Sequence, residues 1–332
     1  MATTATVPTT TMKAVIRRAY GSPDVLELAE VEKPELADDG ALVRVRATSI
    51  NRADWYTLNG APTFARPMMG GLRRPKSPLL GCDFAGVVEA VGKDVTDLEP
   101  DDEVFGGRDG AFAEYVCPRV GIARKPANLS FEEAAALPIA ALTALQGLRD
   151  KGALRPGETV LINGASGGVG TFAVQIAKAF GAEVTAVCST GNVEQARALR
   201  ADHVIDYTHE DFTRSGRRHD LMFDNAGSRS WLDCARVLAP HARVVLVGGP
   251  MGGFFGPLGH IAAMRMRSLG SGRKVVFFLA KFNRPDLAVL RDLAEDGKLR
   301  PVIDRRYQFA EIADALRYMG EGHARGKVVV TV

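Results

Sequence analysis

The chain has 332 residues, of which 46% are hydrophobic and 24% are charged, and its formal net charge is +3. This length exceeds the usual size of one hydrophobic core, so we expect two domains of an ordinary α/β protein. The sequence has no long run of basic residues and no uninterrupted apolar stretch of the ~20 residues that span a membrane. Neither a nucleic acid nor a membrane is therefore an expected partner.

The cysteines and the N-terminal residues indicate a cytoplasmic protein. The four cysteines form no CxxC pair and have no histidine at zinc-ligand spacing, so we expect buried, reduced thiols. They are Cys82, Cys117, Cys188 and Cys234. Residues 1–11 lack the charged and apolar regions of a signal peptide, and we expect them to form a disordered tail.

Short β-strands are predicted for the first third of the chain. Residues 12–31 contain two strand patterns around a Gly-Ser-Pro-Asp turn, which predicts a hairpin. Residues 41–50 alternate small apolar residues with arginine, which is typical of a half-buried strand. Residues 81–92 and 101–119 add strands interrupted by glycine, and together these patterns predict a compact barrel-like sheet domain.

Polar side chains follow directly after the strand that ends at residue 50. An amide, a carboxylate, an indole and a phenol are concentrated there, in Asn51, Asp54, Trp55 and Tyr56. Such a concentration often faces a ligand. The alternative is that Asn51 and Asp54 cap a short helix while Trp55 and Tyr56 fill the core. From the sequence, both interpretations stay open.

Two segments are candidates for substrate specificity. Residues 59–79 carry four prolines and three glycines, which predicts a long surface loop. Loops of this length are usually lids or binding segments. The second segment is GGFFGPLGH, residues 252–260.

The composition becomes helix-rich after residue 127. Ser130 and Glu133 have the spacing of a capping box that opens one helix, and Pro138 stands at the first position of the next.

A glycine-rich turn between a strand and a helix then defines residues 159–180, TVLINGASGGVGTFAVQIAKAF. Compared with the dinucleotide fingerprint G-x-G-x-x-G, the turn has Ala165, Gly167 and Gly170. Gly167 would let the backbone approach a pyrophosphate, and Gly170 would let the helix pack close to the strand. The unpaired N–H groups of the helix N-terminus favour an anion. The unit therefore predicts a dinucleotide site.

Strand and helix patterns alternate after this turn as far as residue 249, which specifies a doubly wound parallel sheet. The strand pattern KVVFFLA, residues 274–280, carries little charge. An exposed edge of that kind promotes association, so we expect a homodimer. The tail resumes with two helices and two strands from residue 286 onward, and we expect it to return to the first domain.

The strand EVTAVCS indicates which dinucleotide binds. NAD-binding versions of this fold place an acid about 20 residues beyond the glycines, but this strand ends without one. Small polar groups are present instead, in Ser189, Thr190 and Asn192. They suit a 2′-phosphate, so we expect NADPH. Arg197 is either a phosphate ligand or part of a solvated helix face, and Tyr207 is a further candidate.

Several motifs together resemble the medium-chain dehydrogenase/reductase superfamily, and more narrowly its zinc-free quinone oxidoreductase branch, which includes zeta-crystallin-like and reticulon-interacting members. They are MKAVIRRAYGSPDVLEL, GCDFAGVVEAVG, the LTAL helix, GASGGVGTFAVQIAK, VIDY and GHARGKVVV. The resemblance implies an α/β fold with a GroES-like β-barrel catalytic domain from residues 12–127 and 280–332. It implies a Rossmann domain, the doubly wound parallel sheet, from residues 128–279. The active site would lie between them.

The resemblance also implies a metal-free site. Zinc-dependent members carry a ligand at each of three positions where this chain has Asn51, Cys82 and either Ala140 or Ala141. Only a cysteine of that set is left, so we expect no metal.

Site residues are implied by the same resemblance. Asn51 would hold the substrate oxygen or the nicotinamide ribose, and Tyr56 would donate a hydrogen bond or a proton, with water as the alternative donor. The implied cofactor contacts are Thr143 near the nicotinamide, Gly168 and Val169 with Gly167 on the pyrophosphate, Ser189 and Tyr207 at the 2′-phosphate, Gly248 and Phe278 along the nicotinamide half, and His323 and Arg325 closing over the cofactor. A surface position at a helix end is equally open for His323.

The function expected from these observations is hydride transfer from NADPH to a quinone or an α,β-unsaturated carbonyl compound, without zinc. Alcohol/aldehyde oxidoreductases and enoyl-thioester reductases are the alternatives within the superfamily. An alternative of another class is a protein that binds NADPH without turnover, as a sensor or scaffold.

Overall fold

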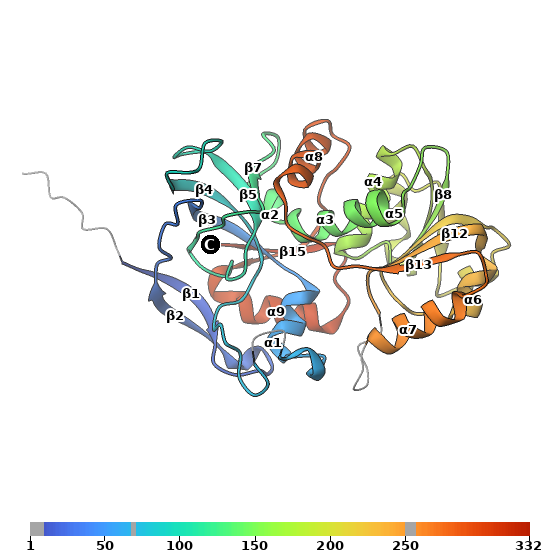
Figure 1. Ribbon diagram of the computed structural model, residues 1–332, viewed down its shortest axis with the longest axis horizontal. Coiled ribbons are helices and arrows are strands. Elements are labelled where there is room, and N and C mark those ends of the chain that lie inside the picture. Colours follow the sequence, from blue (N-terminus) through green and yellow to red (C-terminus); the bar gives the residue numbers. More distant parts are fainter. Residues whose placement is uncertain (1–9, 68–70, 250–256) are drawn as a thin grey trace, which may run out of the picture.

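The computed structural model describes residues 10–67, 71–249 and 257–332, and its strands form three sheets (Figure 1). The predicted hairpin is confirmed: β1 (Thr11–Arg17) and β2 (Leu26–Glu32) pair antiparallel. Strand β1 begins at Thr11, inside the range predicted as a tail. Residues 1–9 of that range lie outside the described residues.

A seven-stranded sheet combines strands from both ends of the chain. Its order is β14-β15-β3-β4-β5-β7, with β6 paired to β3. Strand β15 lies antiparallel beside β3, so the end of the chain completes the sheet that its beginning starts, as the sequence predicted. Figure 1 shows β15 and α9, both red, beside the blue strand β3 and helix α1. The strands are β3 (Ala41–Ile50), β4 (Asp83–Val91), β5 (Glu103–Gly107), β6 (Tyr115–Val116), β7 (Ile122–Arg124), β14 (Ile303–Gln308) and β15 (Lys327–Thr331).

A six-stranded parallel sheet forms the second half of the molecule. Its order, β10-β9-β8-β11-β12-β13, is that of a doubly wound dinucleotide-binding fold. The chain reverses direction across the sheet between β8 and β11, where such folds bind ligands. The predicted KVVFFLA strand is β13, at one edge. The strands are β8 (Thr159–Asn163), β9 (Glu183–Cys188), β10 (His203–Asp206), β11 (His219–Asp224), β12 (Leu238–Leu246) and β13 (Lys274–Phe277).

The helices follow the predicted patterns. The capping box is present, because the Ser130 hydroxyl accepts a hydrogen bond from the Glu133 N–H at 3.2 Å and the Glu133 carboxylate accepts one from the Ser130 N–H at 3.0 Å. The helices are α1 (Arg52–Asn59), α2 (Phe131–Ala135), α3 (Pro138–Gln146), α4 (Gly168–Ala179), α5 (Val193–Ala198), α6 (Trp231–Arg236), α7 (Pro257–Ser268), α8 (Arg284–Glu295) and α9 (Ile312–Glu321). No helix among the described residues is long and apolar enough to cross a lipid bilayer.

Two hydrophobic clusters cover the two faces of the parallel sheet. Phe172 of α4 and Ala196 of α5 belong to one cluster, whereas Trp231 of α6 and Met264 of α7 belong to the other. Figure 1 shows these helix pairs on opposite sides of the sheet. The first cluster also includes Phe105 of the seven-stranded sheet, so the two large sheets share one continuous apolar core through α2 and α3.

The segments predicted to set substrate specificity are described only in part. After α1 ends at Asn59, residues 68–70 lie outside the described residues, as do residues 252–256 of the GGFFGPLGH segment. The proposed role of both segments therefore stays a prediction.

The glycine turn has the packing constraint that the sequence predicted. A β-carbon added to Gly170 would lie 2.1 Å from the Gly164 carbonyl oxygen, a distance that real structures do not tolerate. Gly170 is therefore required for α4 to pass so close to the turn that follows β8.

Replacing Gly170 with alanine is expected to lower the free energy of unfolding by about 1–3 kcal/mol, because the turn and the helix must move apart. Gly259 of α7 supplies a matched control, because an added β-carbon there meets nothing within 4 Å. Gly259→Ala is expected to leave stability unchanged or to raise it by up to about 1 kcal/mol through helix propensity. Urea unfolding followed by circular dichroism measures both. Equal stability of the two variants would contradict the packing argument.

Candidate active site

Strand register brings three residues from distant parts of the chain together. In the antiparallel pairing of β3 with β15, Ile50 lies opposite Val328. Asn51 comes directly after Ile50, and Lys327 comes directly before Val328. These two residues therefore lie at the same end of the strand pair. In the pairing of β3 with β4, Ser49 lies opposite Asp83. An amide, an ammonium group and a carboxylate therefore meet where β3 ends.

The Asn51 side chain is held by charged groups at both ends. Its Nδ2 donates to Asp83 Oδ2 at 2.8 Å, and its Oδ1 accepts a hydrogen bond from Lys327 Nζ. Its backbone N–H donates to Asp54 Oδ2 at 2.7 Å, which caps the start of α1. The helix cap considered from the sequence is therefore confirmed for Asn51 and Asp54, whereas the role of Asn51 at a ligand stays a prediction.

Asp83 is a fully buried carboxylate that accepts several hydrogen bonds. Its Oδ2 accepts from Asn51, from the Ser49 hydroxyl at 3.0 Å and from Lys327 Nζ at 3.4 Å. Its Oδ1 accepts from the Ile139 N–H of α3 at 3.0 Å. Because buried charges are tolerated only when they are paired and hydrogen-bonded, these donors account for the burial of Asp83.

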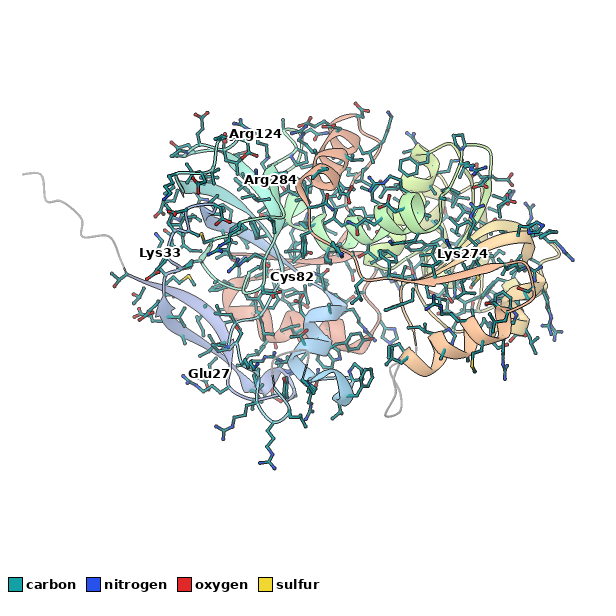
Figure 2. All side chains as sticks on the ribbon, viewed as in Figure 1. Glu27, Lys33, Cys82, Arg124, Lys274 and Arg284 are labelled. Atoms are coloured by element: carbon teal, nitrogen blue, oxygen red, sulfur yellow. The ribbon has the colours of Figure 1, made fainter. Side chains whose placement is uncertain are left out.

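Asp54 and Cys82 complete the buried cluster. Burial, and secondly the negative charge of Asp83, raise the pKa of Asp54 to about 7, although its hydrogen bond with Asn51 and the charge of Lys327 oppose the shift. Burial and the neighbouring carboxylates raise the pKa of the Cys82 thiol, whose sulfur lies 3.5 Å from Asn51 Nδ2. Cys82 is labelled in Figure 2 in the inner part of the lobe that holds β3 and β15. The raised pKa favours the protonated form of the Cys82 thiol.

The cluster adjoins the glycine turn of the parallel sheet. A β-carbon added to Gly168, the first residue of α4, would lie 3.0 Å from Lys327 Cδ and 3.3 Å from the Gly326 carbonyl oxygen. A β-carbon added to Gly167 would make only ordinary van der Waals contacts, at 3.7 Å from Asn225 Nδ2 and 3.9 Å from the Gly164 carbonyl oxygen. The first residue of α4 is thus packed against Lys327, whose positive charge and the unpaired N–H groups of the helix N-terminus both favour an anion.

The end of β9 forms a small polar site. Asn192 Nδ2 donates to the Ser189 hydroxyl at 2.9 Å, whereas the buried Asn192 Oδ1 has no hydrogen-bond partner among the described residues. The Thr190 hydroxyl lies 2.8 Å from that of Thr208. The Arg325 guanidinium lies over Gly191, with a nitrogen 3.1 Å from the position of an added β-carbon. In the part of the chain that the structure describes, Arg325 pairs with no carboxylate, so its charge is available to an anion.

The other residues expected at the cofactor differ in their contacts and in their exposure to solvent. The Thr143 hydroxyl donates to the Ile139 carbonyl oxygen at 2.6 Å, within α3. A β-carbon on Gly248 would lie 2.1 Å from the Asn225 carbonyl oxygen, so close strand packing explains that glycine. Phe278 packs against Gly147. Tyr207 is 53% exposed, and His323 and Val169 are respectively exposed and half-buried.

Tyr56 lies on α1, five residues beyond Asn51, and is half-buried. Its hydroxyl oxygen accepts a hydrogen bond from Arg52 Nε at 3.1 Å, and the Arg52 guanidinium lies 5.6 Å from the ring centroid. The O–H itself donates to no other described residue, so it is available to a ligand.

Sequence reasoning missed Asp83 and Lys327 as site residues. Asp83 lies inside the motif GCDFAGVVEAVG and Lys327 inside GHARGKVVV, but a charged residue at the start of an apolar strand usually marks a solvated strand end. The sequence feature that could have identified them is that each charged residue is the first residue of a largely buried strand. Pairing of the strands was needed to show that the two charges meet.

Comparison with known proteins places these features in a family. Residues 37–126 match the family described as alcohol dehydrogenase GroES-like domain, and residues 199–330 match the one described as zinc-binding dehydrogenase. The 2-methylene-furan-3-one reductase of Solanum lycopersicum is 34% identical over 96% of this chain and 79% of its own length. The chloroplastic NADPH-dependent alkenal/one oxidoreductase of Arabidopsis thaliana is 33% identical over the same shares. The structure of the quinone oxidoreductase from Coxiella burnetii has a TM-score of 0.84 at 33% identity, covering 97% of this chain and 99% of that one.

The fold and the site thus define an oxidoreductase built from a GroES-like sheet domain and a Rossmann-like parallel sheet. The chain belongs to the medium-chain dehydrogenase/reductase superfamily, in its quinone oxidoreductase-like branch. Residues 10–67, 71–249 and 257–332 contain no group of three or more histidine, cysteine or acidic side chains arranged to hold a metal ion.

Replacing Asp54 with asparagine is expected to change how stability depends on pH. An unfolded aspartate has a pKa near 3.8, whereas that of Asp54 is about 7. The folded state therefore retains a proton that the unfolded chain releases, so the contribution of Asp54 is fully present below pH ~4 and is lost as the pH rises to 7. Asparagine still accepts the Asn51 N–H but does not titrate, so this loss should disappear. Urea unfolding between pH 5 and pH 8 measures the slope.

Asp233 is the matched control, because it occupies the same third helical position in α6 but is only half-buried, with a pKa lowered first by its hydrogen bond to Ser230. Asp233→Asn should leave the slope between pH 5 and pH 8 unchanged. If Asp54→Asn also retained the wild-type slope, the raised pKa of Asp54 would be wrong.

Proposed function

We propose that this chain is an NADPH-dependent reductase that transfers a hydride to quinones or α,β-unsaturated carbonyl compounds. The observation that carries the proposal is the contact of Lys327 with Gly168, which places the Asn51 cluster of one sheet against the nucleotide turn of the other. The names of the relatives from tomato, Arabidopsis and Coxiella support the acceptor class. When bound, the nicotinamide supplies the hydride.

The residues of the chain would act by positioning and by hydrogen bonding. Asn51 Nδ2 is already engaged with Asp83, which favours a role for Asn51 in shaping the site over direct donation to the substrate oxygen. Within the described residues the Tyr56 O–H donates to no acceptor, and Arg52 occupies a lone pair of its oxygen. Tyr56 would therefore donate a hydrogen bond to the oxygen on which negative charge develops, and Tyr56 or water would supply the proton.

Action without zinc is part of the proposal, and the donor chemistry of the cluster supports it. Zinc sites need at least three histidine, cysteine or carboxylate ligands, and of the positions that carry them in zinc-dependent members this chain keeps only Cys82. The Asn51 side chain is already bonded to Lys327 and Asp83. Metal analysis of the purified protein should find no stoichiometric zinc, and one zinc ion per chain would overturn this part.

Oxidation of NADPH by a panel of acceptors tests the proposed function. Quinones and enones should accelerate the loss of NADPH absorbance in stopped flow, because their conjugation delocalises the negative charge formed by hydride transfer. Saturated ketones and aldehydes should react at least tenfold more slowly. Faster reduction of the saturated compounds would favour an alcohol/aldehyde oxidoreductase. Tight NADPH binding without oxidation by any acceptor would favour a sensor or scaffold. Unchanged turnover in Tyr56→Phe would assign the proton to water.

Preference for NADPH over NADH is supported by the end of β9 and by Arg325. Residues 189–192 include no acid. The Arg325 guanidinium, which pairs with no carboxylate among the described residues, lies over Gly191 in this segment. A charge-assisted bond of this kind is worth about 1.5–3 kcal/mol. Arg325→Ala should therefore raise the KM for NADPH by roughly tenfold to a hundredfold and change that for NADH by less than twofold.

Arg197 supplies the control for this measurement, because its guanidinium is paired with Glu194 at 2.6 Å in α5. Arg197→Ala should leave the ratio of kcat/KM for the two cofactors unchanged. A wild-type preference for NADH, or an equal loss for both cofactors in Arg325→Ala, would contradict the assignment.

Two further properties are proposed from the same observations. A homodimer through the edge strand β13 is supported by its apolar sequence and by the exposure of Leu279 beside it, and light scattering at micromolar concentration would show its mass. A cytoplasmic location is supported by four free cysteines. The Arabidopsis relative is chloroplastic by name, so cell fractionation is the test of location.

A further inference from the structure

The orientation of the Asn51 carboxamide is specified by charge. An asparagine side chain has nearly the same shape in its two flipped orientations, so hydrogen-bond partners decide between them. Lys327 Nζ can only donate and ionised Asp83 can only accept, and the two groups lie at opposite ends of the carboxamide. A flipped side chain would direct its NH2 at the ammonium group and its oxygen at the carboxylate. Both bonds would be lost and two repulsive contacts would replace them.

Burial raises the free-energy cost of flipping the Asn51 carboxamide. The exposed fractions of the Lys327, Asp83 and Asn51 residues are 2%, 0% and 8%, so water has little access to replace a missing partner. A buried polar group left without its partner costs about 1–3 kcal/mol, and more when the group is charged. The carboxamide is therefore fixed in one orientation as long as both charges are present.

The same lysine contacts the nucleotide turn. A β-carbon added to Gly168, the first residue of α4, would approach the aliphatic stem of Lys327 to 3.0 Å, so the stem packs closely against this glycine. Lys327 thus connects the start of the nucleotide-binding helix with the residue that caps α1, the helix that carries Tyr56.

We propose that Lys327 is a positioning residue of the reductase, whose ammonium group orients the Asn51 carboxamide and whose stem holds that group at a fixed distance from the nucleotide turn at Gly168. This inference rests on the proposed function, in which the substrate is bound beside Asn51 and Tyr56. It assigns Lys327 a role in hydride-transfer geometry and not in contact with the reacting atoms.

Replacement of Lys327 with methionine tests the proposal, because methionine preserves most of the stem but lacks the ammonium group. The kcat with a quinone is expected to fall at least tenfold and by a larger factor than the Kd for NADPH rises. Deuterium at the transferred position of NADPH should give a larger isotope effect on kcat in the variant than in the wild type, because misplaced groups make hydride transfer slower than the other steps.

Lys125 is the matched control, because it is another buried lysine of the same lobe. Its side chain is 5% exposed, and its Nζ donates to the Pro126 and Leu129 carbonyl oxygens and pairs with Glu103. Lys125→Met should lower stability to a similar extent but leave kcat within about twofold of the wild type after correction for the folded fraction. Equal losses of kcat in the two variants would show a merely structural role for Lys327.

A second readout does not depend on turnover. The side-chain amide protons of Asn51, assigned by NMR from their loss in Asn51→Asp, should exchange with water at least tenfold faster in Lys327→Met than in the wild type. Unchanged exchange together with unchanged kcat would overturn the proposal. If none of the acceptors in the panel caused the wild type to oxidise NADPH, the proposed function would fail. Amide exchange alone would then decide whether Lys327 orients Asn51.

The double variant Lys327→Met with Asp83→Asn covers the case in which the single variant does not fold. It removes both charges together, so no unpaired charge from this pair is left buried. We expect the double variant to regain thermal stability but to keep the low kcat and the fast Asn51 exchange, because neither partner specifies the orientation. Wild-type kcat in the folded double variant would overturn the proposal.

Discussion

The buried ammonium group of Lys327, held between Asn51 and Asp83, is the interaction on which the organisation of this molecule depends. A charge that is 2% exposed is tolerated only with an opposite charge and hydrogen bonds, and these come from residues more than 240 positions away in the sequence. The pairing of β15 with β3 meets that requirement. The end of the chain is therefore not an appendage but a part of the first sheet and of the candidate active site.

The segment around Lys327 also joins the two ends of the nucleotide site. Two residues before Lys327, Arg325 lies over Gly191 at the end of β9, whereas Lys327 lies against Gly168 at the start of α4. A single short segment thus places a cation at the proposed adenosine end of the cofactor site and a packing contact at the glycine turn. Because that segment belongs to the seven-stranded sheet, its contacts fix the position of this sheet relative to the parallel one.

The electrostatics of the cluster explain how polar groups are kept in a dry region without being reactive. Asp83 receives hydrogen bonds from Ser49, Asn51 and Ile139, whereas burial raises the pKa of Asp54 to about 7. The Cys82 thiol stays protonated for the same reason. A protonated thiol is a poor nucleophile, which suits a site proposed to accept electrophilic quinones and enones.

The sequence by itself determined the order of elements, the nucleotide turn and the helix caps, because strand periodicity, glycine spacing and capping boxes act over a few neighbouring residues. It also predicted Asn51, directly after a strand, as a site residue, and the structure shows this residue in the buried cluster with Asp83 and Lys327. The meeting of Asn51 with Asp83 and Lys327, and of Arg325 with Gly191, was decided only by the tertiary structure. These contacts depend on strand register across the whole chain, and a lysine or an aspartate at the start of a strand looks the same in sequence whether water or an opposite charge surrounds it.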